Sequence, residues 1–272
     1  MARSPALRVR ASTLAEMRRR AELRHQFATV AGGQLEYWCD GEGPSVVFLS
    51  AFGGDDSLAP IARQLAEEAY VCFYFRPGDF YFRPGDGPPP DRPRTAGSDA
   101  ADLHELLAVA GLPKPVVLVA HSYGGLIADI LAAEHPEDIA GVVFVDASVP
   151  GQEERFHAVL TDGQREYWDA RVQIVPHVDL PTSLAEAADA LRSFPRIPVT
   201  VITATRGLTD PCDEQLPCDE MQTIGLMIQD EFAAALTPDA RHVLADTGHF
   251  VHVDDPDLVV MEIRALLART EH

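Results

Sequence analysis

Short runs of apolar residues recur along this sequence and alternate with longer stretches of helical spacing. Apolar runs of this length are typical of strands that are buried on both faces of a sheet. An alternation of strand and helix predicts parallel strands joined by crossover helices. The predicted strands are 46–49, 70–75, 116–120, 142–145, 199–203 and 242–244, and the predicted helices are 59–68, 100–110, 126–134, 220–235 and 256–269.

Two segments with alternating apolar residues, 27–30 and 35–39, precede the first of these strands and flank Gly32-Gly33. This spacing predicts an antiparallel hairpin that opens an otherwise parallel sheet. We therefore expect the α/β class, with a mostly parallel central sheet flanked by helices. The chain has 272 residues, 46% of them hydrophobic, which is enough for one large core. No apolar run reaches the length of a membrane span.

The alternation stops between 148 and 195, where helical patches occur without a strand signal. We expect a helical lid here, over the carboxyl edge of the sheet, where open α/β sheets bind ligands. The alternative is a packing elaboration with no role in substrate choice. The predicted organisation is thus a basic extension over 1–25, a core formed by 26–147 and 196–272, and the lid over 148–195.

The charge of the chain is strongly uneven. The whole sequence carries a formal charge of −20, yet residues 1–25 hold seven arginines against two glutamates. An acidic body argues against nucleic acid as a partner, since phosphate binding needs a basic surface. The basic arm is either a tail for nucleic acid or membranes or, as we expect, an extension that packs on the acidic body. No apolar segment follows its arginines, so it does not resemble a secretory signal.

Four cysteines are too few for a disulfide scaffold in a chain of this size. Cys39 and Cys72 lie in strand-like stretches and are interpreted as buried thiols. Cys212 and Cys218 each follow a proline in a repeated Pro-Cys-Asp-Glu, which leaves a disulfide or a soft-metal site open. Their spacing matches no zinc motif, and the sequence has no dinucleotide fingerprint. We therefore predict no metal, no cofactor and a cytoplasmic location.

A seven-residue duplication follows the second predicted strand of the parallel series. Residues 73–79 and 80–86 both read Phe-Tyr-Phe-Arg-Pro-Gly-Asp. The unit is too short for a solenoid repeat. Only the first copy can complete the strand, so the second copy is expected to lengthen the loop behind it.

The most informative segment is the strand 116–120 with the residues that follow it. The strand runs into Ala120-His121-Ser122-Tyr123-Gly124 and then into a predicted helix. A serine between a buried strand and a helix, with small residues two positions either side, is the context of a nucleophile elbow. The start of the helix also favours a developing anion.

From about residue 27 onward the chain resembles the α/β-hydrolase superfamily. Besides the elbow, Ser50-Ala51-Phe52-Gly53-Gly54 occupies the position of the oxyanion loop, and Asp246-Thr247-Gly248-His249-Phe250 follows the last strand. Ser50-Ala51 departs from the usual His-Gly. The resemblance implies that Ser122 is the nucleophile and His249 the base, and that the N–H groups of Tyr123 and Phe52 bind the oxyanion. His242 and His252 are expected to be structural.

Ser122 and His249 need an acidic residue to complete a catalytic triad, and carboxylates after two different strands are candidates for it. Asp146 follows the strand 142–145, and Asp210 lies beyond the strand 199–203, about three residues later than the superfamily pattern places its acid. We favour Asp146 and keep Asp210 as the alternative, with Asp213 behind both.

These residues predict a serine hydrolase that forms an acyl-enzyme with a small, fairly apolar ester, lactone or thioester. The serine argues against branches that use an aspartate nucleophile. Because a fold does not fix a function, two alternatives remain. One is a biosynthetic enzyme that cyclises, dehydrates or cleaves a carbon–carbon bond with the same Ser-His pair. The other is a ligand-binding or signalling module with little turnover. A small molecule is the expected partner in each case, and the sequence does not define the oligomeric state.

Overall fold

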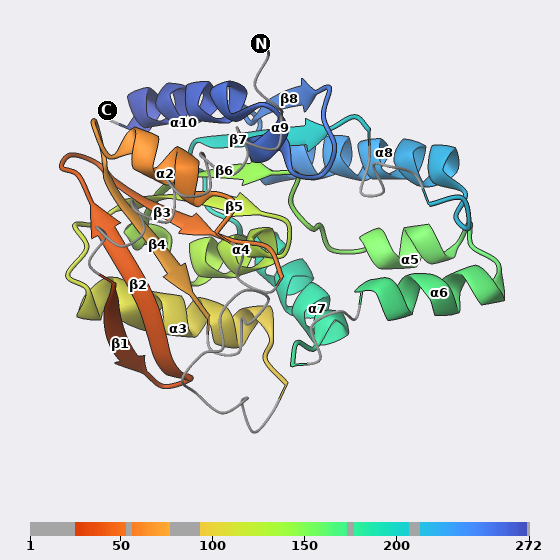
Figure 1. The fold of residues 1–272 in the computed structure, drawn as a ribbon, viewed down its shortest axis with the longest axis horizontal. Helices are drawn as coiled ribbons and strands as arrows, with labels where there is room; N and C mark the ends of the chain where they lie inside the picture. The colour runs from red at the N-terminus through yellow and green to blue at the C-terminus, as the bar shows by residue number, and fades with distance from the viewer. Residues whose placement is uncertain (1–24, 53–55, 77–92, 173–176, 207–212, 271–272) are drawn as a thin grey trace, which may run out of the picture.

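The fold is built on one mixed sheet, seen in the computed structural model of the chain (Figure 1). The structure describes residues 25–52, 56–76, 93–172, 177–206 and 213–270. Eight strands in the described ranges pair in the order β1-β2-β4-β3-β5-β6-β7-β8. Helices cover both faces, so the predicted α/β class with a mostly parallel sheet is confirmed.

The antiparallel part of the sheet lies at one edge. β1 (Gln26–Val30) and β2 (Gly33–Asp40) form the predicted hairpin, and β2 also pairs antiparallel with β4 (Tyr70–Phe75). Gly33 has a φ of 130°, a backbone conformation that favours glycine, at the turn between the two hairpin strands.

The parallel part contains the strands that lead to the candidate site. They are β3 (Ser45–Leu49), β5 (Val116–His121), β6 (Ile139–Val145), β7 (Val199–Ala204) and β8 (Arg241–Ala245). Every residue of β3, β5 and β7 is buried, whereas most of β8 is exposed or half-buried. The edge position of β8 explains why its sequence signal is weak.

Two helical layers cover the sheet. One cluster of buried side chains joins the sheet to α3 (Ala96–Val109), α4 (Gly124–Glu134) and α8 (Cys218–Leu236). A second cluster joins the opposite face to α2 (Ala59–Leu65), α9 (Val251–Asp254) and α10 (Pro256–Thr270). The inner parallel strands β3, β5, β6 and β7 are therefore buried from both sides, as their continuous apolar sequences require.

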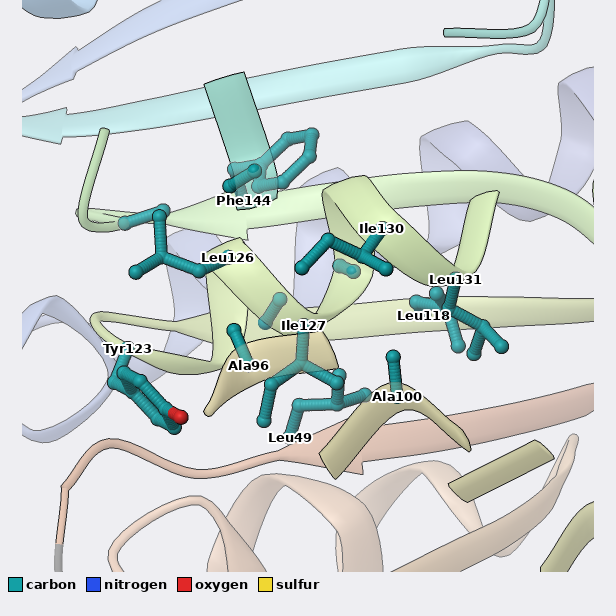
Figure 2. Close-up of a cluster of buried hydrophobic side chains, with 14 of the residues drawn as sticks. Leu49, Ala96, Ala100, Leu118, Tyr123, Leu126, Ile127, Ile130, Leu131 and Phe144 are labelled. Carbon is teal, nitrogen blue, oxygen red and sulfur yellow. The ribbon is translucent and has the colours of Figure 1, made fainter. Parts of the chain in front are cut away.

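The centre of the first cluster lies where α4 crosses the sheet and packs against α3 (Figure 2). Side chains from three strands meet those of both helices there. They include Leu49, Ala96, Ala100, Leu118, Tyr123, Leu126, Ile127, Ile130, Leu131 and Phe144. The helix that follows the candidate nucleophile is thus held by the main core and not by a surface contact.

The segment 148–195 folds into α5 (Gln152–His157), α6 (Asp162–Val172), α7 (Leu180–Ala190) and a short 3-10 turn. α7 is fixed at the start of α3, because Ser183 Oγ accepts from the N–H of Ala96 (2.9 Å) and Glu186 accepts from the N–H of Gly97 (2.8 Å). α5 instead packs near α8. The segment is helical, as expected, and its two ends contact different parts of the core.

The interpretation of Cys39 and Cys72 as buried thiols is wrong. The two residues lie directly opposite each other on β2 and β4 and form a disulfide, with their Cα atoms 4.2 Å apart. Cys218 is also disulfide-bonded, and Cys212 lies outside the described residues. Because cytosolic thiols are normally kept reduced, the disulfides run against the cytoplasmic location expected from the cysteine count.

Some sequence features fall outside the part of the chain that the structure describes. These are the basic arm up to residue 24, the second copy of the duplication at 80–86, and Asp210. Among the helices that are described, none combines the length and apolar character needed to cross a bilayer.

A buried carboxyl group in α4 is expected to lower the stability of the fold near neutral pH. Asp129 is fully buried, and neither of its carboxylate oxygens has a hydrogen-bond partner among the described residues. Burial raises the pKa of Asp129 well above its ordinary value. The folded protein therefore keeps a proton that the unfolded chain releases as the pH rises. Between the two pKa values, the free energy of unfolding should fall by about 1.4 kcal/mol per pH unit.

Asp129→Asn removes this titration without changing the size of the side chain. We expect urea unfolding to show a more stable variant at pH 7.5, with the difference shrinking as the pH falls towards 4. Asp179→Asn is the control, because the N–H of Thr182 donates to Asp179 and lowers the pKa of that carboxyl. Parallel pH profiles for Asp129→Asn and the wild type would contradict the expectation.

Candidate active site

Ser122 lies in the turn between β5, which ends at His121, and α4, which begins at Gly124. Its φ is 52°, in the left-handed region that non-glycine residues rarely adopt. The turn is held against the end of β6, since Ser122 N donates to Val145 O (3.4 Å) and Ser148 N donates to Ser122 O (2.9 Å). A strained backbone at a buried turn is a feature of functional positions.

Two glycines allow this turn to sit close to neighbouring strands. A Cβ atom on Gly124 would lie 2.5 Å from the carbonyl oxygen of Leu49, at the end of β3. A Cβ atom on Gly125 would lie 2.5 Å from the Cβ of Ala147, just after β6. The small residues in the elbow therefore serve the approach of β3 and β6 as well as the turn itself.

Asp146 and His249 form a direct contact. His249 Nδ1 donates to Asp146 Oδ2 at 2.7 Å, and both side chains are largely buried. Asp146 Oδ1 accepts from the N–H of Ala204 at 2.9 Å, so the carboxylate is fixed from two sides. With its Nδ1 proton held in this way, the imidazole leaves Nε2 as the nitrogen that can accept a proton.

Asp146 has the same backbone signature as Ser122. Its φ is 41°, and these two are the non-glycine residues with positive φ in the described chain. Its N–H donates to Ile202 O at 2.7 Å, which ties the end of β6 to β7. The strained conformation turns the carboxylate towards the loop after β8, where His249 lies.

Of the two other carboxylates that the sequence left open, the one that the structure describes, Asp213, is not brought to His249. Asp210 lies outside the described residues. Asp213 accepts a hydrogen bond from Tyr167 Oη and pairs with Arg171 at 3.3 Å. The structure therefore places Asp146 against the histidine and engages Asp213 elsewhere.

Ser122 is close to this pair in the fold but is not hydrogen-bonded to it. It is 7% exposed, and its Oγ makes no hydrogen bond with any described residue. Hydrogen bonds between a nucleophile and its base are often long in ligand-free enzymes and tighten when substrate binds. The arrangement thus supplies an assembled Asp-His pair and a nearby serine.

Two further histidines lie beside His249. His121 Nε2 donates to the backbone carbonyl of His249 at 3.1 Å, and His252 Nε2 is hydrogen-bonded to Ser57 Oγ at 2.6 Å. Burial lowers the pKa of His121 well below its ordinary value. Burial, followed by the proximity of His249, lowers the pKa of His252 to about 3. Both stay neutral near pH 7, in keeping with the structural role expected for His252.

The two residues expected to supply oxyanion N–H groups lie side by side. Phe52 follows β3, Tyr123 follows Ser122, and their rings stack with centroids 4.4 Å apart. Tyr123 Oη donates to Asp99 Oδ2 at 3.1 Å, deep in the core. Gly53 and Gly54 lie outside the described residues, so the loop is described only as far as Phe52.

A cavity of about 310 Å³ adjoins the Asp-His pair. Its walls come from the ends of β6 and β7 and from α5 and α8, and the lining residues include His249 and Asp146 but not Ser122. The other lining residues are Ala147, Ser148, Gln152, Phe156, Thr203, Ala204, Thr205, Arg206, Cys218, Asp219, Met221, Gln222, Gly225, Ile228 and Gln229. The volume is in the range of sites for small ligands.

Several of these wall residues could not be found from the sequence. Gln229 donates to the carbonyl of Ala147 (2.7 Å) and Gln222 to that of Ala204 (3.4 Å), so both amides fasten α8 to the strand ends. The helical spacing of α8 indicates an amphipathic helix but not that its polar residues reach the site. Of the aromatic residues of the segment 148–195, Phe156 lines the cavity, whereas Trp168 donates to Glu153 (2.6 Å) and packs behind Phe156.

One group in the described chain has the composition of a metal site. His135 and Asp138 follow the end of α4 that is remote from Ser122, and His104 of α3 lies beside them. The two imidazoles are stacked with an angle of 8° between their planes. Asp138 Oδ2 already pairs with Lys114 Nζ at 2.6 Å. An ion cluster accounts for the arrangement.

Comparison with known proteins supports the fold described above. The sequence pattern of the alpha/beta hydrolase family matches residues 46–262. A segment of 126 residues is 35% identical to the probable transporter efuK of Hormonema carpetanum, covering 45% of this chain and 17% of that protein. Another of 109 residues is 35% identical to pimeloyl-[acyl-carrier protein] methyl ester esterase of Chromobacterium violaceum, covering 40% and 39%. The chain thus spans less than half of the length of either relative.

The fold is similar to that of the enol-lactonase from Burkholderia xenovorans LB400. The TM-score is 0.61 at 21% identity, and the match covers 89% of this chain and 100% of that one. At this level of identity the likeness concerns the fold alone.

Proposed function

The chain belongs to the alpha/beta hydrolase family, and we propose that it is a serine hydrolase that cleaves a small, fairly apolar ester, lactone or thioester through an acyl-enzyme on Ser122. One observation carries the proposal. A carboxylate and an imidazole lie 2.7 Å apart beside a serine that a strand-to-helix turn holds at a φ of 52°. This combination has the residue types and order of a Ser-Asp-His triad.

The chemistry follows from the roles of these groups. His249 Nε2 accepts the hydroxyl proton of Ser122 as its Oγ bonds to the substrate carbonyl carbon. The carbonyl π electrons move to its oxygen, which the N–H groups of Tyr123 and Phe52 stabilise. His249 then returns the proton to the leaving alkoxide or thiolate as its bond to carbon breaks. Water, deprotonated by His249, attacks the acyl-enzyme and releases the acid and Ser122.

Asp146 has an electrostatic and orienting role in this scheme. It accepts a hydrogen bond from the Nδ1–H of His249 and stabilises the imidazolium that forms during attack. Its second oxygen is occupied by the N–H of Ala204. The carboxylate therefore stays in place while the histidine gains and loses a proton.

The cavity and the relatives support the substrate class. A volume of about 310 Å³ with both apolar and amide walls suits a short acyl or alcohol group. The Chromobacterium relative acts on a methyl ester and the Burkholderia neighbour on an enol-lactone, as their names state. The net charge of −20 repels anionic substrates and so disfavours them. Salt limits this repulsion to distances of roughly 8 Å from the protein surface.

We also infer that part of the segment 148–195 acts as a lid. Phe156 and Gln152 of α5 line the cavity, so movement of α5 relative to α8 would change access to His249. α7 is fastened to the start of α3 and belongs with the core. The lid function is therefore assigned to α5 and α6 rather than to the whole segment.

Pre-steady-state hydrolysis of p-nitrophenyl esters tests the proposal. We expect a burst of p-nitrophenol equal to the enzyme concentration, because acylation of Ser122 by an activated ester is faster than hydrolysis of the acyl-enzyme. The butyrate ester should be cleaved faster than the dodecanoate ester, because the cavity is small. A folded protein with neither burst nor turnover would favour the ligand-binding module. Acylation of Ser122 without turnover on any ester or lactone would favour biosynthetic chemistry.

A further inference from the structure

Arg76 is a buried cation at the end of β4, in the first copy of the duplicated heptapeptide. It is 5% exposed. Its Nη1 donates to the carbonyl oxygen of Ser50 at 3.0 Å, and its Nη2 donates to the carbonyl oxygen of Ala51. One guanidinium thus holds two consecutive carbonyls of the loop that leads from β3 to Phe52.

These two hydrogen bonds fix the orientation of the peptide that carries the Phe52 N–H. A trans peptide is planar, so its C=O and N–H point in opposite directions. The carbonyl of Ala51 and the N–H of Phe52 belong to the same peptide. While Arg76 holds that carbonyl, the Phe52 N–H is directed away from Arg76 and cannot rotate unless a charge-assisted hydrogen bond breaks.

Arg76 also touches the residue that carries the second oxyanion donor. Its guanidinium carbon lies 5.2 Å from the centre of the Tyr123 ring, in a cation–π arrangement. The Tyr123 ring also stacks on Phe52, and the Tyr123 hydroxyl donates a hydrogen bond to Asp99. Asp99 Oδ2 lies 4.0 Å from Arg76 Nε, so the arginine, the tyrosine and the carboxylate form one buried group.

A second arginine provides a natural comparison. Arg94 is also buried and binds Asp99 Oδ1 through Nε at 2.7 Å. Its contacts with Asp99 and Asp102 anchor the carboxylates at the start of α3. Arg76 and Arg94 therefore share Asp99, but the hydrogen bonds to the Ser50 and Ala51 carbonyls come from Arg76.

We propose that Arg76 is a positioning residue that sets the oxyanion donors Phe52 and Tyr123 in place before substrate binds. The inference rests on the proposed function, because it concerns the N–H groups assigned to the tetrahedral intermediate. The guanidinium acts through the backbone and the Tyr123 ring and does not contact the substrate. Its loss should weaken binding of the transition state more than binding of the substrate.

The test compares Arg76→Met and Arg76→Lys with the control Arg94→Lys. For each folded variant, the readouts are kcat and KM on p-nitrophenyl butyrate and the rate constant of Ser122 labelling by a fluorophosphonate. Loss of one oxyanion donor costs about 100- to 1000-fold in kcat, so misplacing it in Arg76→Met should cost about 10- to 100-fold. The labelling rate should fall in parallel while KM changes by less than about threefold, because the lost interaction belongs to the transition state.

Arg76→Lys should retain part of the activity, since an ammonium keeps the charge but cannot hold both carbonyls with a planar fork. If Arg76→Met folds poorly, Arg76→Lys is compared with Arg94→Lys instead. Arg94→Lys should lose stability but keep kcat and the labelling rate near wild type. Equal losses of kcat in Arg76→Lys and Arg94→Lys, or wild-type labelling in folded Arg76→Met, would overturn the inference and leave the proposed function intact. A folded wild-type protein that is not labelled would overturn both.

Discussion

Asp146→Asn should lower kcat by about two to four orders of magnitude while the protein stays folded. In the wild type, Asp146 Oδ2 accepts a hydrogen bond from His249 Nδ1 at 2.7 Å, and Asp146 Oδ1 accepts one from the backbone N of Ala204 at 2.9 Å. Asparagine can keep its oxygen on Ala204, which turns its NH₂ group towards His249. The imidazole must then carry its proton on Nε2, where it cannot accept one from Ser122. Steady-state kinetics on p-nitrophenyl butyrate, with circular dichroism to check folding, measure this effect.

Asp210→Asn and Asp213→Asn are the matched controls for this variant. Each replaces one carboxylate oxygen by an NH₂ group, as Asp146→Asn does. Asp213 is engaged by Tyr167 and Arg171, so its loss should affect stability near α6 and leave kcat within a few-fold of wild type. Near-full activity in Asp146→Asn, together with a large loss in Asp210→Asn, would reverse the assignment of the acid.

Ser122→Ala should have the largest effect on catalysis, about a million-fold loss of kcat, because the acyl-enzyme can no longer form. The burst of p-nitrophenol should vanish, and the small turnover that remains should come from the oxyanion donors and substrate binding. The fold should be retained, since Ser122 Oγ makes no hydrogen bond with the described residues. Rapid-mixing absorbance measurements on the wild type and the variant give both quantities.

Ser57→Ala is the control for Ser122→Ala. Unlike Ser122, Ser57 is hydrogen-bonded to a histidine, with 2.6 Å between its Oγ and His252 Nε2. The second nitrogen of His252 is buried and has no hydrogen-bond partner in the part of the chain that the structure describes, so no described carboxylate orients this histidine as a general base. Ser57→Ala should therefore keep the burst. A burst that survives in Ser122→Ala and disappears in Ser57→Ala would move the nucleophile to Ser57.

Much of the fold and the serine turn could be predicted from the sequence, because both depend on local patterns. Continuous apolar runs mark strands buried on both faces, and β3, β5 and β7 are fully buried. The strand, the small residues and the helix around Ser122 are adjacent in the chain. The order of residues along a short segment is therefore sufficient to predict such a turn.

The remaining features depend on how distant segments approach one another. Asp146 and Asp210 both follow strands, and the choice between them depends on which strand end the loop of His249 reaches. The disulfide between Cys39 and Cys72 depends on the register of β2 against β4, across 33 residues of sequence. Arg76 would be taken for a surface residue until β3, α3 and Tyr123 are seen to enclose it.

The most direct test of the account is the mass of the protein after reaction with a fluorophosphonate. We expect one adduct per chain in the wild type, located by peptide mapping on the fragment that contains Ser122. The adduct should be absent from Ser122→Ala and formed at the wild-type rate in Ser57→Ala. A folded wild-type protein that gains no mass, or an adduct that maps to a residue other than Ser122, would contradict the proposal that Ser122 is the nucleophile of a serine hydrolase.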